Sequence, residues 1–230
     1  RRETCITDRG PPDMFLWKAV PAASGEQNPS SCGCPAENGE MRRPGVVKME
    51  EYRLVFKLCS LLFEYPQEEW QKDDLQQTLC LIKDKNVKEE LAAFLGYLES
   101  TPFETVCEYY VHQFDFRAET SLYLTYGIFG DNMERGSALV KLKMEFAKAG
   151  FFVKGKELPD YLPMILEFAA IAEINSVRKI FQIHQKQMEK LQAKLAEVDS
   201  PYAHLLNACL SAFNSLQAEP LEERNAGNAG

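Results

Sequence analysis

The pattern of hydrophobic positions divides the chain near residue 48. Before that point, six of the twelve prolines stand among glycines and polar residues, and apolar residues cluster only at residues 14–17. A segment of this composition buries too little apolar surface to offset the entropy that a chain loses on folding. We therefore expect residues 1–48 to be mostly disordered. Because the chain opens with Arg1, one hypothesis is that residues 1–40 derive from an upstream reading frame.

From residue 49 onward, apolar residues recur at the three- and four-residue spacing that is typical of amphipathic helices. Strand-like alternation is not sustained anywhere in this stretch. The pattern predicts an all-α fold, a single globular bundle of about eight or nine helices over residues 49–218. The polar, Gly- and Asn-rich end at residues 219–230 is expected to be a flexible tail.

Capping residues, prolines and glycines set the expected helix ends. Thr101 is expected to cap the helix that has Pro102 at its first position. Asp131 is expected to cap a later helix, and Gly150 to end it. Between these two helices, a short apolar helix is expected over residues 122–128.

Charge is distributed unevenly between the two parts of the chain. The whole chain has 26 Lys and Arg against 34 Asp and Glu, a formal net charge of −8. The first 48 residues hold seven basic and six acidic side chains, so residues 49–230 carry a net charge of −9. Because nucleic-acid binders usually present a basic surface, this class of partner is not expected.

The composition indicates a cytoplasmic protein. No stretch of roughly 18 uninterrupted apolar residues occurs, so no membrane-spanning helix is expected, and the N-terminus lacks the apolar core of a secretory signal. The seven cysteines are scattered and odd in number, unlike a disulfide framework. Four of them are expected to be small, buried apolar residues: Cys59, Cys80, Cys107 and Cys209.

Few residues carry obvious catalytic chemistry. The chain has three histidines. It has none of the common metal-binding or nucleotide-binding motifs and none of the common motifs that carry a catalytic nucleophile. Glu108 and His112 are four residues apart, which would allow a helical metalloenzyme, but a surface pair is the favoured interpretation. Cys32 and Cys34 supply only part of the ligand set that a structural metal requires. An enzyme is therefore not expected.

Three stretches do not look like generic amphipathic helix. The first reads SLLFEYP at residues 60–66. The second reads FDFRAETSLYLTY at residues 114–126 and is followed by ERG at residues 134–136. The third reads GFF at residues 150–152, followed by ELPDYLP at residues 157–163, and it ends with LEF at residues 166–168.

In their order and spacing, these stretches resemble the NarJ family, the "delta subunit" chaperones of respiratory nitrate reductase, within the larger TorD-like group. The resemblance runs from about residue 50 to residue 215. One departure stands at Asp160 and Tyr161, where many TorD-like chaperones have Asp-His. A tyrosine keeps an aromatic face and a hydroxyl but does not titrate near neutral pH, so a histidine-dependent contact is not implied.

The resemblance implies a non-enzymatic chaperone that binds the N-terminal peptide of the apo catalytic (alpha) subunit of nitrate reductase. Such a chaperone holds its client in the cytoplasm while the molybdenum cofactor is inserted and before the enzyme docks on the membrane. It binds no cofactor itself and does not insert stably into the membrane. The alternative is a chaperone of the same build for a dimethyl sulfoxide or trimethylamine N-oxide reductase.

For the site, the resemblance implies peptide-binding residues inside the motifs. Aromatic rings are expected to line an apolar groove for an amphipathic helix, and carboxylates to make charge-assisted contacts to the peptide. The negative domain would attract a basic leader peptide and speed the encounter. The expected peptide-binding residues are Phe114, Asp115, Ser121, Tyr123, Tyr126, Arg135, Leu158, Pro159, Asp160, Tyr161, Pro163 and Glu167.

These residues also have structural interpretations. Asp160 is suited to cap a helix that begins at the next residue, and Pro159 and Pro163 to shape the loop and start that helix. Arg135 is suited to a buried salt bridge, with Gly136 allowing close packing. Most of the leucine and phenylalanine side chains in these motifs are expected in the core rather than in a groove.

Overall fold

The computed structural model describes residues 44–68, 70, 72–153 and 157–218 of the chain. The segment up to residue 43 and the tail at 219–230, both predicted to be disordered or flexible, lie outside the described residues. Within the described residues the chain forms nine α-helices, one short 3₁₀ helix and no named strand, which confirms the all-α prediction. The elements are α1 (Pro44–Leu62), α2 (Lys72–Leu81), α3 (Lys85–Ser100), α4 (Phe103–Phe114), η1 (Ala118–Thr120), α5 (Tyr126–Phe129), α6 (Glu134–Lys148), α7 (Leu162–Ile171), α8 (Ile174–Glu197) and α9 (Tyr202–Ala218).

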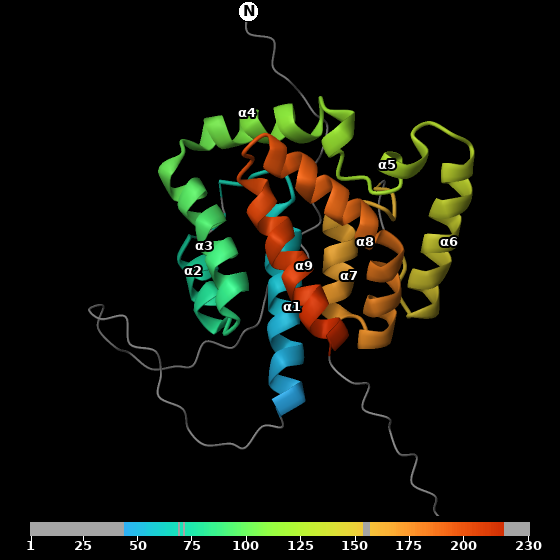
Figure 1. Ribbon diagram of the computed structural model, residues 1–230, viewed down its shortest axis with the longest axis horizontal. Coiled ribbons are helices and arrows are strands. Elements are labelled where there is room, and N and C mark those ends of the chain that lie inside the picture. The colour runs from blue at the N-terminus through green and yellow to red at the C-terminus, as the bar shows by residue number, and fades with distance from the viewer. Residues whose placement is uncertain (1–43, 69, 71, 154–156, 219–230) are drawn as a thin grey trace, which may run out of the picture. The chain divides into compact units, whose positions relative to one another are not determined.

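The arrangement of the helices centres on α1 and α9 (Figure 1). Helix α1 packs along α7 and α9, and α3 and α8 both pack against α9. Figure 1 shows α2 and α3 on one side of this group, α4 crossing above it, and α6 on the opposite side at the edge. The two ends of the described chain therefore meet in the core, while α4 to α6 lie around it.

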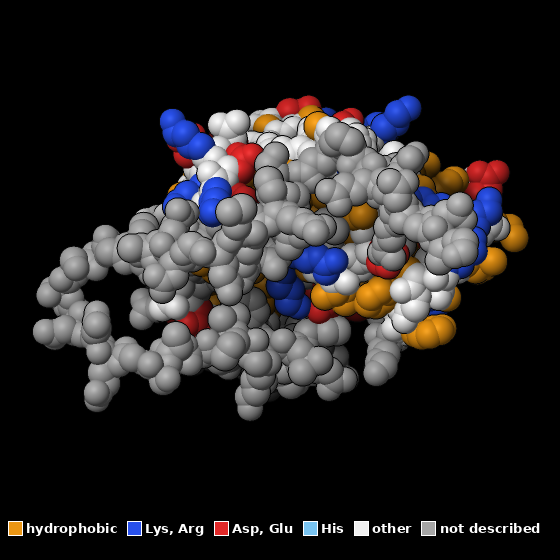
Figure 2. Space-filling model, turned by 90° about the horizontal axis from the view of Figure 1, so that it is seen from below, with side chains coloured by type: hydrophobic (Ala, Val, Ile, Leu, Met, Phe, Trp, Pro, Cys, Tyr) orange, Lys and Arg blue, Asp and Glu red, His pale blue; other side chains and the backbone are white. Residues whose placement is uncertain are grey.

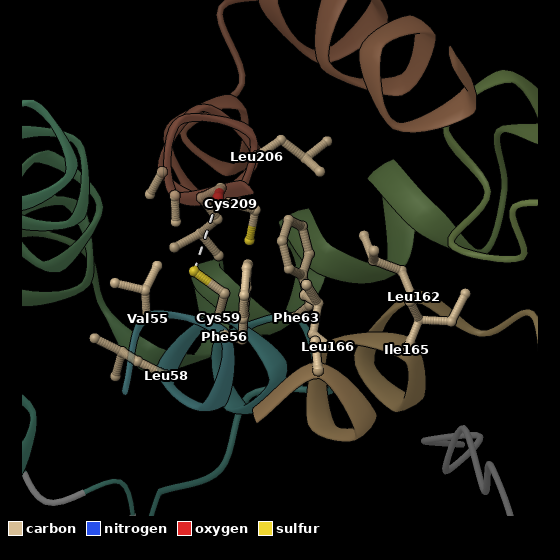
Figure 3. Packing of buried hydrophobic residues seen from close by; sticks show 14 of the residues in the cluster. Val55, Phe56, Leu58, Cys59, Phe63, Leu162, Ile165, Leu166, Leu206 and Cys209 are labelled. Carbon is tan, nitrogen blue, oxygen red and sulfur yellow. Dashed lines mark hydrogen bonds between the residues drawn. The ribbon is translucent and has the colours of Figure 1, made fainter. Parts of the chain in front are cut away.

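The core forms where the buried faces of α1, α7 and α9 meet (Figure 3). Figure 3 shows side chains from the three helices pointing toward one another, and the labelled ones are at most 1% exposed. Burying a large apolar side chain in this way stabilises the fold by roughly 1.5–3 kcal/mol. The labelled members are Val55, Phe56, Leu58 and Cys59 of α1 and Phe63 just after it, Leu162, Ile165 and Leu166 of α7, and Leu206 and Cys209 of α9.

A second part of the core is an aromatic cluster around Tyr202, the first residue of α9. Its neighbours come from α3, α4 and the turn after α1, so that one ring links α9 to three other parts of the chain. Offset and edge-on ring pairs of this kind add stabilisation beyond their buried area. The ring centroids of Phe63, Phe94, Tyr109, Tyr110 and Phe114 lie 4.9–6.3 Å from that of Tyr202.

Two of the predicted helix starts are wrong. Pro102 is the N-cap residue of α4 and the helix begins one residue later, so Thr101 does not cap it. Asp131 does not cap α6, because the helix begins at Glu134 and the side chain of Asn132 accepts a hydrogen bond from the Glu134 N–H at 3.2 Å. In both cases the helix begins later along the chain than the capping pattern predicts, since helix ends are set less sharply by sequence than helix interiors.

The predicted end of α6 is confirmed. Gly150 follows the helix with a φ of 85°, the left-handed conformation that ends many helices and that glycine adopts without steric cost. The chain then turns back, and the side chains of Phe151 and Phe152 have different surroundings. The Phe151 ring contacts that of Phe168 at 5.2 Å, whereas the Phe152 side chain is exposed.

The predicted burial of the cysteines is correct for two of the four. Cys59 and Cys209 are buried, and the Cys59 thiol donates to the Leu205 carbonyl at 3.7 Å, as the dashed line in Figure 3 shows. Cys107 is only half-buried and Cys80 is exposed on α2. The apolar character of cysteine does not by itself say which face of a helix a residue lies on.

Candidate functional site

The two longest motifs meet as a pair of extended segments. The Leu124 N–H donates to the Asp160 carbonyl at 3.0 Å, and the Leu162 N–H donates to the Leu122 carbonyl at 2.8 Å. These bonds form an isolated antiparallel bridge between Tyr123 and Tyr161. The prediction of a helix over 122–128 is therefore wrong for its first half, because this backbone pairs with the other motif and only α5 remains helical.

The carboxylate of Asp160 is the centre of this contact and is fully buried. Its Oδ2 accepts hydrogen bonds from the Thr125 N–H at 3.1 Å and from the Thr125 hydroxyl. Arg135 of α6 lies 3.5 Å from the same oxygen and donates from its Nε to the Thr125 hydroxyl at 3.1 Å. We call Thr125, Arg135 and Asp160 the loop node, since they join both motifs to α6.

The loop node answers the structural questions that the sequence left open. The salt-bridge interpretation of Arg135 is confirmed, with its side chain 19% exposed against 0% for Asp160. The capping interpretation of Asp160 is wrong, since α7 has Tyr161 as its N-cap and no side-chain cap. Gly136 is not a close-packing residue, because a Cβ added there would meet no atom within 4 Å.

A buried histidine lies near the loop node. His184 of α8 is 2% exposed, and burial lowers the pKa of its imidazole to about 4, against the opposing charge of Asp160. Among the described residues, neither ring nitrogen of His184 nor the Oδ1 of Asp160 has a hydrogen-bond partner. His184 is therefore a neutral group in an environment where its charged form is unfavourable.

Tyrosines extend the contact toward α1 and α4. The Tyr123 and Tyr161 rings lie 5.2 Å apart, and the Tyr123 hydroxyl donates to Glu157 at 2.6 Å. The Tyr161 hydroxyl lies 3.5 Å from the Tyr110 hydroxyl and 3.4 Å from Glu64. Burial, followed by the neighbouring charges and the bond to Tyr161, raises the pKa of Tyr110 well above its usual value.

Helix α7 is in turn tied to α1 by polar contacts. The Ser60 hydroxyl donates to the Pro163 carbonyl at 2.8 Å, and Lys57 pairs with Glu167 at 2.8 Å. Arg53 donates to the carbonyls of Ala170 and Ala172 at the end of the same helix. The ELPDYLP motif thus starts a helix that is held along its whole length.

The structure buries five of the twelve predicted site residues and leaves the other seven at least partly exposed. Asp115 is exposed, Ser121, Tyr123, Tyr126, Arg135, Leu158 and Glu167 are half-buried, and Phe114, Pro159, Asp160, Tyr161 and Pro163 are buried. Ser121 accepts a hydrogen bond from the Tyr123 N–H, and the Arg135 guanidinium lies 5.3 Å from the Tyr126 ring centroid. Direct contact between these residues and a peptide stays a prediction.

A different part of the surface is hollowed. The turn after α1 and helices α2, α3 and α4 enclose a hollow of about 170 Å³, which we call the α2–α4 hollow. Leu75, Leu95 and Val106 form buried parts of its wall, and Trp70, Leu98 and Phe103 are half-buried. The complete lining is Pro66, Gln67, Glu68, Trp70, Leu75, Gln76, Leu95, Leu98, Glu99, Thr101, Phe103 and Val106.

The charge around the α2–α4 hollow is negative. Glu68 and Glu99 are the charged residues in its described lining. Burial raises the pKa of the Cys107 thiol, and a hydrogen bond with Tyr65 lowers it. The charges of Glu104 and Glu68 raise this pKa further, which shows that both glutamates lie near this part of α4. An apolar hollow with an acidic rim suits the apolar side chains of a peptide that also carries positive charge.

The size of the α2–α4 hollow limits what it can hold. Pockets for small organic ligands usually measure about 300 Å³ or more, so this one suits one or two peptide side chains. A second hollow of about 340 Å³ lies between η1 and the end of α8, but it is lined mainly by charged residues such as Arg117, Glu119 and Lys194. That lining does not offer an apolar helix face a place to dock.

The residues of the α2–α4 hollow were not among the predicted site residues. Trp70, Leu75 and Leu98 recur at helical spacing, as core residues do, and nothing in their spacing distinguishes a hollow from a core. The one available signal is Trp70 itself, an aromatic residue that follows acidic residues just before a helix. Within the described part of the chain, its Nε1 is buried without a hydrogen-bond partner.

The described residues form neither a metal site nor a helix that could span a membrane. No group of three or more His, Cys, Asp and Glu side chains in the described ranges lies close enough together to hold a metal ion. None of the described helices combines the length and apolar character that crossing a bilayer requires. Glu108 and His112, the pair considered from the sequence, are both exposed on α4.

Comparison with known proteins points to one family. The model for the nitrate reductase delta subunit family matches residues 83–208. The chain is 37% identical, over 166 residues that cover 71% of it and 90% of the relative, to the probable nitrate reductase molybdenum cofactor assembly chaperone NarJ of Bacillus subtilis (strain 168). It is 27% identical over 179 residues, 75% of each chain, to the nitrate reductase molybdenum cofactor assembly chaperone NarJ of Escherichia coli (strain K12).

A further match is to part of a much longer protein. The nitrate reductase-like protein NarX of Mycobacterium tuberculosis (strain H37Rv) is 29% identical over 155 residues, which cover 67% of this chain but only 24% of NarX. The likeness thus extends to a unit within a longer polypeptide.

Proposed function

Because this chain belongs to the nitrate reductase delta subunit family, we propose that it is a dedicated assembly chaperone for a nitrate reductase. Its relatives are named as chaperones of molybdenum cofactor assembly. In this proposal the chain binds the N-terminal peptide of the apo catalytic subunit in the cytoplasm. It keeps the subunit open to cofactor insertion and delays docking on the membrane until insertion is complete.

The observation that carries the proposal is the α2–α4 hollow. Its wall combines half-buried apolar side chains, including Trp70 and Leu98, with the carboxylates of Glu68 and Glu99. A peptide that forms an amphipathic helix would place one or two apolar side chains in it and basic side chains at the rim. The acidic surface would mainly speed the encounter, and the apolar contacts would supply most of the affinity.

The motif residues have a supporting role in this proposal. The loop node and the contacts between α7 and α1 hold the motif loops, which include the exposed Asp115 and the half-buried Tyr126, in fixed positions. The exposed and half-buried members of the predicted site are proposed to contact parts of the client beyond the hollow. The buried members act through the stability of these loops.

The proposed activity is binding, not catalysis. The chain would hold its client without forming or breaking bonds in it, and would itself bind no molybdenum cofactor. The cofactor is inserted into the client, so its ligands belong to the client. The chaperone contributes by keeping the client peptide away from premature partners, which requires only affinity and release.

Titration with a synthetic peptide tests the proposal directly. The full chain contains two tryptophans, Trp17 and Trp70, so a Trp17→Phe variant reports on Trp70 alone. The N-terminal peptide of the same organism's nitrate reductase catalytic subunit should shift the Trp70 emission and give heat in calorimetry, with micromolar affinity or better. A leader peptide from a dimethyl sulfoxide or trimethylamine N-oxide reductase serves as the control for the alternative client.

A pair of matched variants locates the site. Leu98→Ser in the hollow should weaken binding of the nitrate reductase peptide at least about tenfold. Leu210→Ser, which changes a half-buried leucine of α9 outside the hollow, should leave the affinity within about twofold. An equal loss of affinity in both variants would contradict the proposal that the peptide binds in the hollow. Tighter binding of the control peptide would indicate that the client is a dimethyl sulfoxide or trimethylamine N-oxide reductase.

A further inference from the structure

Exposed apolar side chains gather around α6, away from the α2–α4 hollow. Five of the large hydrophobic residues that the fold leaves exposed lie between residues 128 and 152. They are Ile128, Met133, Val140, Met144 and Phe152. Soluble proteins expose single apolar side chains everywhere, but a run of them on one element indicates an interaction surface.

Three of these side chains form a stripe that begins at Met133, the N-cap residue of α6, and continues along the helix. Met133, Val140 and Met144 are seven and four residues apart, which places them on one side of a helix with 3.6 residues per turn. Their exposed fractions are 93%, 57% and 54%. The opposite side of α6 carries Leu142 and Phe146, which are buried against the bundle. Helix α6 is thus apolar on an inner and on an outer face.

Basic side chains flank this outer stripe. Lys143 lies on one side of it by helical spacing, and Lys141 and Lys148 lie on the other. All three are exposed. Helix α6 holds three lysines and one arginine against two glutamates. Of these, Arg135 belongs to the loop node and Lys148 pairs with Glu145 at 2.9 Å. Residues 49–230 as a whole carry a net charge of −9. Figure 2 shows hydrophobic and basic side chains, with some acidic ones beside them, at its right-hand edge, the side on which α6 lies.

We propose that the outer face of α6, defined by Met133, Val140, Met144 and the three lysines, binds peripherally to an anionic lipid bilayer. The apolar side chains would enter the boundary between headgroups and acyl chains, and the lysines would extend to the phosphates. This binding is shallow and reversible, and it does not depend on the proposed client.

Charge and shape favour a bilayer over a protein partner. Two copies meeting through this face would bring their lysines together, which opposes self-association. The face also protrudes, since Met133 is almost fully exposed and neither described hollow includes α6 residues. A bilayer accepts protruding side chains without a complementary groove, and its anionic headgroups are attracted to each lysine near the surface.

Flotation with vesicles tests the inference on the full chain. We expect binding to vesicles of equal parts phosphatidylglycerol and phosphatidylcholine at low salt, and much weaker binding to pure phosphatidylcholine or at high salt. Lys141→Gln with Lys143→Gln should lower the partition coefficient about thirtyfold. Val140→Gln with Met144→Gln should lower it at least about tenfold.

Matched controls separate this effect from net charge and from folding. Lys83→Gln with Lys85→Gln, which changes two exposed lysines just before and at the start of α3, should leave vesicle binding within about twofold. Peptide titration of the α6 variants should be unchanged, so a failure of the proposed client contact would leave this inference standing. An equal loss in the control pair would overturn it. A second result would also overturn it. If the wild-type chain were a dimer and Val140→Gln with Met144→Gln made it a monomer, the face would bind a second copy and not a bilayer.

Discussion

The loop node and the α2–α4 hollow differ in how they relate to the sequence. The node is built from the most distinctive stretches of the chain, and its Asp160 is completely buried. The hollow is lined by residues such as Leu75, Leu95 and Glu99, which occur in any amphipathic helix. The centre of the distinctive region is buried, whereas the wall of the hollow is partly exposed.

The difference has a physical cause. A buried charge requires specific partners at specific distances, here the Thr125 N–H and hydroxyl and the Arg135 guanidinium, so few sequences satisfy it. An apolar hollow requires only side chains of suitable size on three helices. Distinctive sequence therefore marks the place where the fold is demanding, and concavity marks the place where binding is available. Substitutions in the node should act on stability, and those in the hollow on affinity.

Replacing the central carboxylate is expected to have the largest effect. Asp160→Ala should lower the free energy of unfolding by about 3 kcal/mol, because it leaves Arg135 and the Thr125 hydroxyl partly buried without their acceptor. Urea denaturation measures this change. Asp115→Ala, which removes an exposed carboxylate from the neighbouring motif, should cost less than about 1 kcal/mol. A folded Asp160→Ala protein of normal stability that no longer binds the peptide would reverse the comparison.

The node also shows how far sequence reasoning reaches. Helical periodicity located α3, α7, α8 and α9, because one face of each is buried over several turns. It failed at residues 122–125, where backbone bonds to residues 160–162 form an isolated bridge at Tyr123 and the chain turns before α5 begins. Such pairing depends on a segment far along the chain, so local propensity could not reveal it.

The candidate site was harder to predict than the fold. The motifs pointed to residues that belong together, and the structure does bring Tyr123, Asp160 and Arg135 into one cluster. Whether such residues face a partner or the interior depends on packing between helices, which one sequence does not contain. Leu98 and Phe103 of the α2–α4 hollow have the same spacing as core residues, so their partial exposure became visible only in three dimensions.

Protonation of His184, which lies near the loop node, should make the stability of the fold depend on pH. Burial lowers the folded-state pKa of this imidazole to about 4, below its ordinary value of 6.5. The unfolded chain therefore binds a proton as the pH falls through 6.5, while the folded chain does so only near pH 4. Stability from this group is full above pH 6.5 and declines by about 3 kcal/mol as the pH falls to 4.

A substitution isolates this contribution. His184→Leu should flatten the decline in unfolding free energy between pH 6.5 and 4, while stability at pH 7 changes by no more than about 1 kcal/mol. Denaturation of both proteins across this pH range provides the comparison. The same slope in both would mean that other groups, Asp160 among them, carry the pH dependence.

Removing the Tyr110 hydroxyl, which lies between the motifs at residues 60–66 and 157–163, should have a smaller effect on stability. The buried Tyr110 hydroxyl donates to the Phe63 carbonyl at 2.9 Å and lies near that of Tyr161. Tyr110→Phe should lower the unfolding free energy by about 1–2 kcal/mol, because the buried carbonyl loses its donor. Tyr109→Phe, on the half-buried neighbour, is the matched control and should be close to neutral. Thermal denaturation that ranks the two variants in the opposite order would contradict this account.

The smallest expected effect tests the hollow alone. Glu68→Gln with Glu99→Gln removes two rim charges but keeps side chains of similar size, so stability should change by less than about 0.5 kcal/mol. Affinity for a basic client peptide should fall about fivefold at low salt, and the deficit should shrink at high salt because the lost attraction is screened. Trp70 emission in the Trp17→Phe background measures both affinities. Glu89→Gln, an exposed change elsewhere on α3, should leave the affinity unchanged; if it weakens binding equally, general charge and not the rim of the hollow attracts the peptide.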